Sequence, residues 1–199
     1  MKSTGFRSKV LFGSLLLALP LLFIADLIFG SVYIPAQEVI SILFGNESNN
    51  YAHEIIVLHS RLPKALTATI CGAALSLSGL QMQALFRNPL AGPYILGISN
   101  GAGLGVALLV MAGSLFGFSI TGSIGITFAA MLGAALTLAV IFFFSIRIKD
   151  IMTVLIVGIM LGSVATAFIG IIQYVSTAAS LKSFLIWSMG SLEGLNYNE

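Results

Sequence analysis

The chain has 199 residues, of which 58% are hydrophobic and only 8% are charged, with a formal net charge of +2. A soluble domain carries about 25% charged residues, so this composition excludes an ordinary soluble globule, a disordered chain and a nucleic-acid-binding protein. The single cysteine, Cys71, excludes an internal disulfide and a metal site built from cysteines. Such a chain is expected in a bilayer, where apolar surface faces lipid without penalty.

Five stretches are long and apolar enough to cross a membrane as helices, because a span needs about 20 apolar residues. They cover residues 10–30, 64–86, 93–113, 118–146 and 151–175. Basic residues precede the first stretch, as in a signal peptide. However, its apolar run is too long and no A-x-A cleavage site follows, so we predict a retained anchor.

The placement of Lys and Arg predicts a cytoplasmic N-terminus and an outer C-terminus. Cytoplasmic segments would hold Lys2, Arg7, Lys9, Arg87, Arg147 and Lys149, and outer segments Arg61, Lys64 and Lys182. Residues 31–60 are then an outer linker segment of one transmembrane domain, residues 1–199. Within this linker Pro35 predicts the start of a short amphipathic helix that runs through Phe44, because proline is tolerated at the first helical position.

Small residues recur every fourth position in four of the spans, which places them on one face of each helix. Such faces let helix backbones approach closely in lipid, so they predict packing between spans, and a substrate path is the alternative. The series are Ala68, Gly72 and Ser76; Gly97, Gly101, Gly105 and Gly113; Thr121, Gly125, Ala129, Gly133 and Thr137; and Gly158, Gly162, Thr166 and Gly170.

Motifs for nucleotide binding and metal-dependent catalysis are incomplete. No G-x-x-x-x-G-K-[ST] loop is present, and the glycines from 101 to 105 lie inside an apolar span without a preceding strand. His53 and Glu54 begin an H-E-x-x-H pattern, but position 57 is Val57. We therefore predict no metal site and no catalytic residues in this chain.

Two polar features stand out. Arg61 and Lys64 flank Pro63 at the outer start of the second span, where they either anchor the helix at the interface or form a basic docking patch for an acidic partner. The turn Arg87-Asn88-Pro89 separates the second and third spans. Polar side chains near this turn require internal partners or a water-filled path; they are Gln81, Gln83, Ser99 and Asn100.

These residues closely resemble the FecCD-like permeases, the membrane subunits of ABC importers for iron–siderophore complexes, haem and cobalamin. The resemblance covers most of the chain from about residue 61 onward. The matching stretches are RLPK at 61–64, GAALSLSG at 72–79, QALFRNPLA at 83–91, Pro93, LGISNGAG at 96–103, LIVG at 155–158 and WSMGSL at 187–192.

The resemblance implies an all-α polytopic permease that works as a homodimer in the cytoplasmic membrane. Partner ATPase subunits would bind ATP and magnesium, and an extracytoplasmic binding protein would deliver the chelate. The resemblance further implies that Arg61 and Lys64 dock the binding protein, so Arg61→Glu is expected to weaken its capture. It also implies that the fifth span, through Gly158, Gly162 and Thr166, lines the translocation path.

The chain also departs from the family pattern. Gly92 stands where an acidic residue is frequent in the family. Lys64 replaces the more usual arginine, and a lysine lacks the planar pair of donors with which an arginine binds a carboxylate through two hydrogen bonds. Family members have about ten spans, so this chain is expected to be the N-terminal half of a permease whose halves resemble inverted repeats. The leading hypothesis is an importer permease that works by ATP-driven alternating access. The alternatives are an inactive remnant or membrane scaffold, and a membrane enzyme that uses His53, Glu54, His59 and Arg61.

Overall fold

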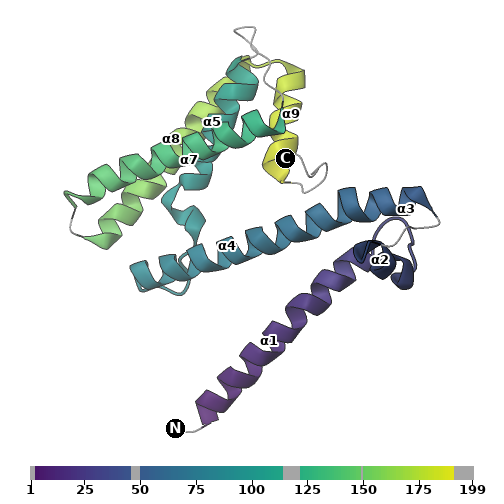
Figure 1. Ribbon diagram of the computed structural model, residues 1–199. Coiled ribbons are helices and arrows are strands. Elements are labelled where there is room, and N and C mark those ends of the chain that lie inside the picture. Colours follow the sequence, from purple (N-terminus) through teal and green to yellow (C-terminus); the bar gives the residue numbers. More distant parts are fainter. Residues whose placement is uncertain (1–2, 46–49, 114–121, 149, 191–199) are drawn as a thin grey trace. The chain divides into compact units, whose positions relative to one another are not determined.

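The computed structural model describes residues 3–45, 50–113, 122–148 and 150–190, and in these residues the regular structure is entirely helical (Figure 1). The contacts divide the chain into two compact units, one from Met1 to Ala73 and one from Ala74 to Ser191. Four helices are long and apolar enough to cross a membrane, namely Phe6–Ile28, Tyr51–Phe86, Ser123–Ser145 and Ile151–Val175. The all-α polytopic fold is therefore confirmed.

The first unit begins with α1 (Ser3–Ile28), which is followed by α2 (Ala36–Leu43). Pro35 and Phe44 flank α2 as its N-cap and C-cap residues, so the short helix expected after Pro35 is confirmed. Then follow α3 (Tyr51–Ile55), the π-helical turn η1 (Ile56–Arg61) and the start of α4 (Leu62–Phe86).

The second span begins earlier than expected. The predicted linker, residues 31–60, already contains α2, α3 and η1, and the helix from Tyr51 continues without a break to Phe86. Asn50 caps this helix by accepting a hydrogen bond from the Ala52 N–H at 3.0 Å. Pro63 does not start the helix, because the π turn precedes it: the Leu62 N–H bonds to the carbonyl of Val57, five residues back.

A small hydrophobic core joins the elements of the first unit. We call it the cap cluster, and its buried members are Leu27, Ile34, Val39, Ile42, Val57 and Ala65. These residues come from the end of α1, the connection after it, α2, η1 and the first turn of α4. The cap cluster therefore fixes the carboxyl end of α1 against the segment that leads into α4.

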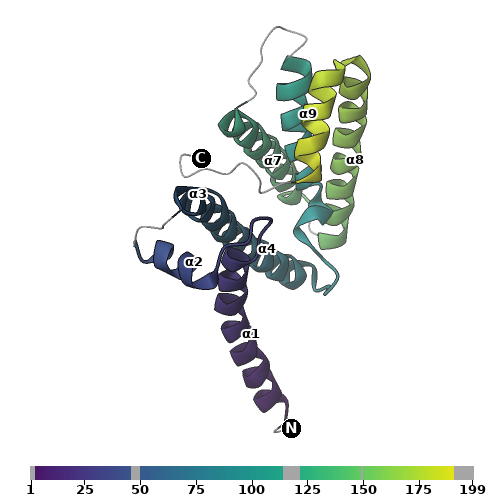
Figure 2. The ribbon, with the colours of Figure 1, turned by 90° about the vertical axis from the view of Figure 1, so that its right-hand side faces the viewer.

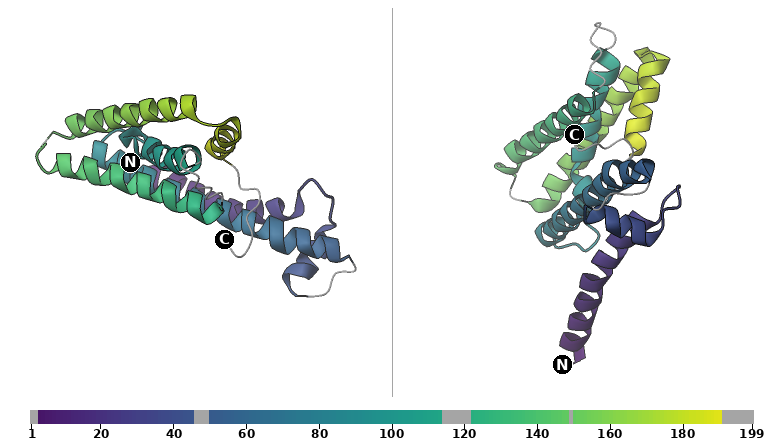
Figure 3. Two further views of the ribbon diagram at one scale, coloured as in Figure 1. Left: turned by 90° about the horizontal axis from the view of Figure 1, so that it is seen from above. Right: turned by 45° about the vertical axis from the view of Figure 1, so that its right-hand side comes forward.

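The second unit contains the end of α4, the 3₁₀ turn η2 (Pro93–Leu96), α5 (Ile98–Ala107) and the π turn η3 (Leu108–Ala112). Its other helices are α7 (Ser123–Ser145), α8 (Ile151–Val175) and α9 (Ala178–Met189). Helix α5 lies between α7 and α8, as the left view of Figure 3 shows. The third predicted span therefore starts at Ile98 rather than at residue 93, because Gly97 breaks the helix with a positive φ of 69°.

Helix α9 was not predicted from the sequence. It packs alongside η3 (Figure 2). Phe184 is buried in a cluster with Val106 and Met111, and Trp187 packs against that cluster. The rings of Phe184 and Trp187 lie 6.1 Å apart between centroids. Because α9 has only 12 residues, it is too short for a span, and the apolar-run criterion missed it.

Asp150 forms the N-cap of α8, and this contact leads to a first prediction. Its carboxylate accepts hydrogen bonds from the Thr153 hydroxyl at 2.6 Å and from the Thr153 and Met152 N–H groups at 2.9 and 3.4 Å. These bonds, the Thr153 hydroxyl first, hold the pKa of Asp150 below its ordinary value. We expect Asp150→Ala to lower the thermal midpoint in detergent, and Asp150→Asn, which keeps an acceptor, to lower it less.

The pH dependence of this effect follows from the direction of the shift. A lowered native pKa stabilises the fold above the unfolded-state pKa, about 3.9 for Asp, and this contribution is lost as the pH falls through the native value. The midpoint difference between wild type and Asp150→Ala should therefore be full at neutral pH and shrink in strong acid. A difference that stays constant down to low pH would contradict an ionised cap.

Candidate functional site

The two cations predicted to dock a partner have different surroundings. Arg61 is only 8% exposed, and its guanidinium lies inside the first unit. Its Nη1 donates hydrogen bonds to the carbonyls of Leu27 and Ile28, each at 2.8 Å, and its Nη2 donates to the carbonyl of Val32 at 2.5 Å. Lys64, in the first turn of α4, is exposed. Of the pair, only Lys64 presents its charged group at the surface.

The turn after α4 is tight and polar. Arg87 is exposed and has a positive φ of 48°, which is uncommon for a residue with a side chain. The Asn88 N–H bonds to the carbonyl of Gln83 at 3.2 Å, and the Asn88 side chain accepts the N–H of Leu90 at 2.9 Å. Asn88 therefore closes the turn that Pro89 continues. The cytoplasmic location of this turn remains a prediction.

The polar residues on either side of this turn are arranged unevenly. Gln81 and Gln83 are exposed on α4, and Ser99 is exposed in the first turn of α5. Asn100 is exposed as well, and it donates from Nδ2 to the carbonyl of Gly162 in α8 at 3.1 Å. Asn100 thus connects α5 to α8 and still has exposed surface, as the other three residues do.

The predicted path residues of α8 take part in helix packing. Gly158 and Gly162 are buried, and a β-carbon on Gly158 would lie 3.0 Å from the Cα of Leu96. Two side chains donate hydrogen bonds to the carbonyl of Gly162, that of Asn100 and, at 2.9 Å, the hydroxyl of Thr166. A carbonyl oxygen has two lone pairs, so this junction is satisfied within the chain.

The small faces of α5 and α7 meet directly. A β-carbon on Gly101 would overlap the Thr137 side chain, and one on Gly105 would overlap the carbonyl of Ala129. The packing predicted from the small-residue series is therefore observed between these two helices. In α4, by contrast, Ala68, Gly72 and Ser76 are exposed in the structure.

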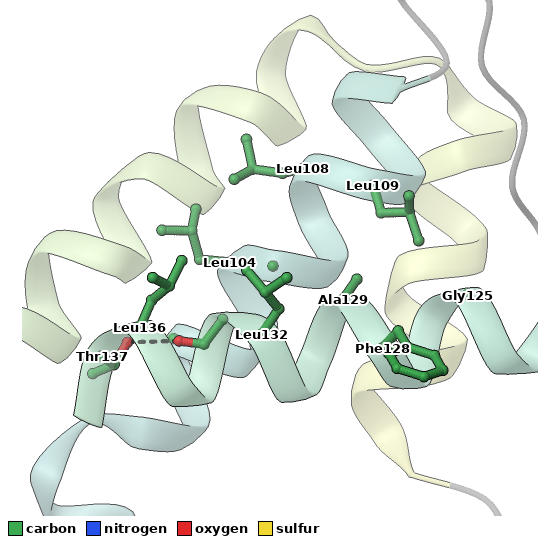
Figure 4. Close-up of a pocket in the computed structure, with 12 residues that line it drawn as sticks. Leu104, Leu108, Leu109, Gly125, Phe128, Ala129, Leu132, Leu136 and Thr137 are labelled. Atoms are coloured by element: carbon green, nitrogen blue, oxygen red, sulfur yellow. Dashed lines mark hydrogen bonds between the residues drawn. The ribbon is translucent and has the colours of Figure 1, made fainter. Parts of the chain in front are cut away.

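A groove of about 650 Å³ follows the contact between α5 and α7 (Figure 4). Its lining is almost wholly apolar, and Leu104, Leu132 and Phe128 extend along it. The hydroxyl of Thr137 donates to the carbonyl of Gly133 at 3.0 Å and is therefore occupied. None of the polar residues predicted to line a path contributes to this groove. Its surface suits the acyl chains of lipids or the apolar side chains of a protein better than a polar cargo.

The two histidines of the first unit have different surroundings. Nδ1 of His53 lies 3.0 Å from Oε1 of Glu38, which connects α3 to α2, while His59 is exposed. In the residues that the structure describes, no group of three or more His, Cys, Asp or Glu side chains could hold a metal ion. The His53–Glu38 contact was not predicted from the sequence, because the two residues lie on separate short helices.

Comparison with known proteins places this geometry in a family. Residues 16–199 match the model of the FecCD transport family. The vitamin B12 import system permease protein BtuC of Citrobacter koseri is 37% identical over 73% of this chain and 43% of its own length. The molybdate import system permease protein MolB of Haemophilus influenzae is 32% identical over 96% of this chain and 56% of its own.

A solved structure agrees with the sequence match. It is described as an inward-facing conformation of a metal-chelate type ABC transporter, and it superposes with a TM-score of 0.76 at 31% identity. The alignment covers 96% of this chain and 56% of the other. The chain spans about half the length of the curated relatives it matches. The chain is a multi-pass membrane protein and belongs to the FecCD transport family.

Proposed function

We propose that this chain forms part of the permease of an ABC importer that carries a metal-containing compound across the cytoplasmic membrane. The observation that carries the proposal is the structural match, which extends over 96% of the chain at 31% identity. The spans support it, because α5, α7 and α8 contain no Asp, Glu, Lys or Arg. A wide path without fixed charges suits a bulky complex better than a simple ion.

The proposed cargo is an iron–siderophore complex, haem or cobalamin. Relatives named for vitamin B12 and molybdate, together with a metal-chelate transporter, support a metal-containing compound as the cargo class. In this proposal the N-terminus is cytoplasmic, a second permease copy completes the path, and a partner ATPase supplies ATP hydrolysis. Exposed Gln81, Gln83 and Ser99, together with Thr166, are the proposed polar contacts along the path.

Uptake in cells tests the proposal. Cells that lack the gene should lose uptake of one radiolabelled cargo among ferric siderophore, haem and cobalamin, and the gene restored at its own locus should recover it. Molybdate uptake is measured in parallel, because one relative is a molybdate permease. Unchanged uptake of all four compounds, together with failure of the chain to co-purify with any ATPase, would favour a scaffold or an inactive remnant.

The exposed Lys64 leads to a prediction about docking. We propose that an acidic binding protein contacts Lys64, which is exposed at the start of α4. Reversal of this charge by Lys64→Glu should slow association with the importer's binding protein by roughly tenfold at low salt. The loss should shrink at high salt, because exposed charges are screened.

Two variants control this measurement. Lys64→Arg keeps the charge and should retain association. Lys182→Glu changes another exposed cation, on α9, and should have little effect. An association rate for Lys64→Glu that matches wild type at low salt would remove Lys64 from the docking surface.

A further inference from the structure

We infer that Arg61 is a positioning residue that closes the carboxyl end of α1 from another helix. Its three hydrogen bonds all go to backbone carbonyls, those of Leu27, Ile28 and Val32. These carbonyls lie about 30 residues earlier in the chain, at the last turn of α1 and in the connection to α2. Within the described residues, Arg61 forms no ion pair with a carboxylate.

The end of α1 explains why such a contact is needed. The last carbonyls of a helix have no partner within the helix, and they carry the negative end of its dipole. Leu27 is 2% exposed and belongs to the cap cluster, so water does not readily replace a lost hydrogen bond there. A guanidinium provides several donors in one plane and a positive charge, and both match a cluster of helix-end carbonyls.

Gly30 provides a second and independent observation. A β-carbon on Gly30 would lie 2.6 Å from Nη2 of Arg61 and 2.8 Å from its Cζ. The backbone of Gly30 therefore lies directly against the guanidinium, and any side chain would displace the arginine. Gly30 and Arg61 form one unit, which we call the α1 clamp.

The α1 clamp fixes the segment that leads into α4. Val57, Arg61 and Ala65 are all buried, and they are spaced four residues apart along η1 and the start of α4. Two of them belong to the cap cluster, and Arg61 lies between them. Lys64 follows in the next turn and is exposed. If Lys64 docks a binding protein, as proposed above, the clamp holds the helix turn that presents it, and this part of the inference rests on the proposed function.

Hydrogen exchange of the purified full chain in detergent tests the clamp without any partner. Arg61→Gln and Gly30→Ala should each speed exchange in the last turn of α1 and in residues 29–34 by about tenfold or more, because each removes the guanidinium hydrogen bonds. Exchange in the double variant should be only slightly faster than in the faster of the two single variants, since both changes break the same contact. Arg61→Lys, which keeps the charge but loses the planar fork, should not restore protection.

Two matched controls accompany these variants. Gly13→Ala makes the same chemical change within α1 at a glycine with nothing within 4 Å. Lys64→Gln removes the neighbouring exposed charge. Both should leave exchange in residues 29–34 unchanged. The clamp would be overturned if residues 29–34 exchanged at the same rate in Gly30→Ala as in Gly13→Ala. It would also be overturned if the effects of Gly30→Ala and Arg61→Gln on exchange were additive.

A second readout separates positioning from direct contact. Gly30→Ala alters no charge, so under the clamp it should slow capture of the binding protein as much as Arg61→Gln does, without changing the salt dependence. Lys64→Gln should instead flatten the salt dependence. Loss of capture in Arg61→Gln but not in Gly30→Ala would assign direct contact to Arg61. If the wild type captures no binding protein, the docking proposal fails, while the exchange experiment still decides the clamp.

Discussion

Gly133→Ala is expected to destabilise the second unit by about 1–3 kcal/mol, because it forces extra volume into a contact between two helix backbones. A β-carbon on Gly133 would overlap the carbonyl oxygen of Gly101 and lie 3.1 Å from the Cα of Gly105. Backbone atoms cannot rotate away as a flexible side chain can. Helices α5 and α7 would therefore have to separate, and close approach of small residues is a main source of helix association in lipid.

Thermal unfolding in detergent micelles measures this effect, and Gly170→Ala is the matched control. Gly170 also lies in a membrane-spanning helix, but nothing approaches its β-carbon position within 4 Å. Alanine favours a helix over glycine by about 1 kcal/mol, so the control should keep or raise the midpoint. Equal midpoints for the two variants would show that α5 and α7 do not meet at Gly133.

Gly97→Ala is expected to destabilise the second unit more than Gly133→Ala does, for two separate reasons. Gly97 has a φ of 69°, a left-handed conformation that costs a residue with a side chain roughly 1–2 kcal/mol. Its β-carbon would also lie 2.6 Å from the carbonyl oxygen of Gly158 and 2.8 Å from the Cα of Gly162. The overlap adds about 1–3 kcal/mol and moves α8 away from the start of α5.

A second substitution at the same position separates these two contributions. Asparagine adopts the left-handed conformation more readily than alanine does, but it carries the same β-carbon. Gly97→Asn should therefore keep the overlap with α8 and lose only part of the backbone cost, so its thermal midpoint should stay well below that of the wild type. A wild-type midpoint for Gly97→Asn would show that the contact between Gly97 and α8 contributes nothing to stability.

The membrane-spanning helices were largely predictable from the sequence. Residues 151–175 were expected as a span, and α8 has the same limits. The helix expected after Pro35 is also present, because proline restricts the backbone to a conformation suited to a helix start. Predictions of this kind succeed because the lipid requires a continuous apolar run and internal hydrogen bonds for every backbone group.

The candidate site was predictable only in part. The small-residue series correctly indicated close packing, and Gly133 and Gly101 are in contact. The series did not show that Gly158 and Gly162 face the start of α5, where Asn100 bonds to the carbonyl of Gly162. A four-residue repeat indicates which face of a helix is small, but it contains no information about which helix covers that face.

The sequence by itself determined that the chain lies in a membrane, where most of its long apolar helices lie and which family it resembles, because these properties follow from composition, run length and local motifs. Only the tertiary structure decided the surroundings of Arg61, which the motif grouped with Lys64 as a second docking cation. Its partners are backbone carbonyls far away in the chain. Every residue has a carbonyl, so no side-chain pattern indicates which ones a distant arginine will bind.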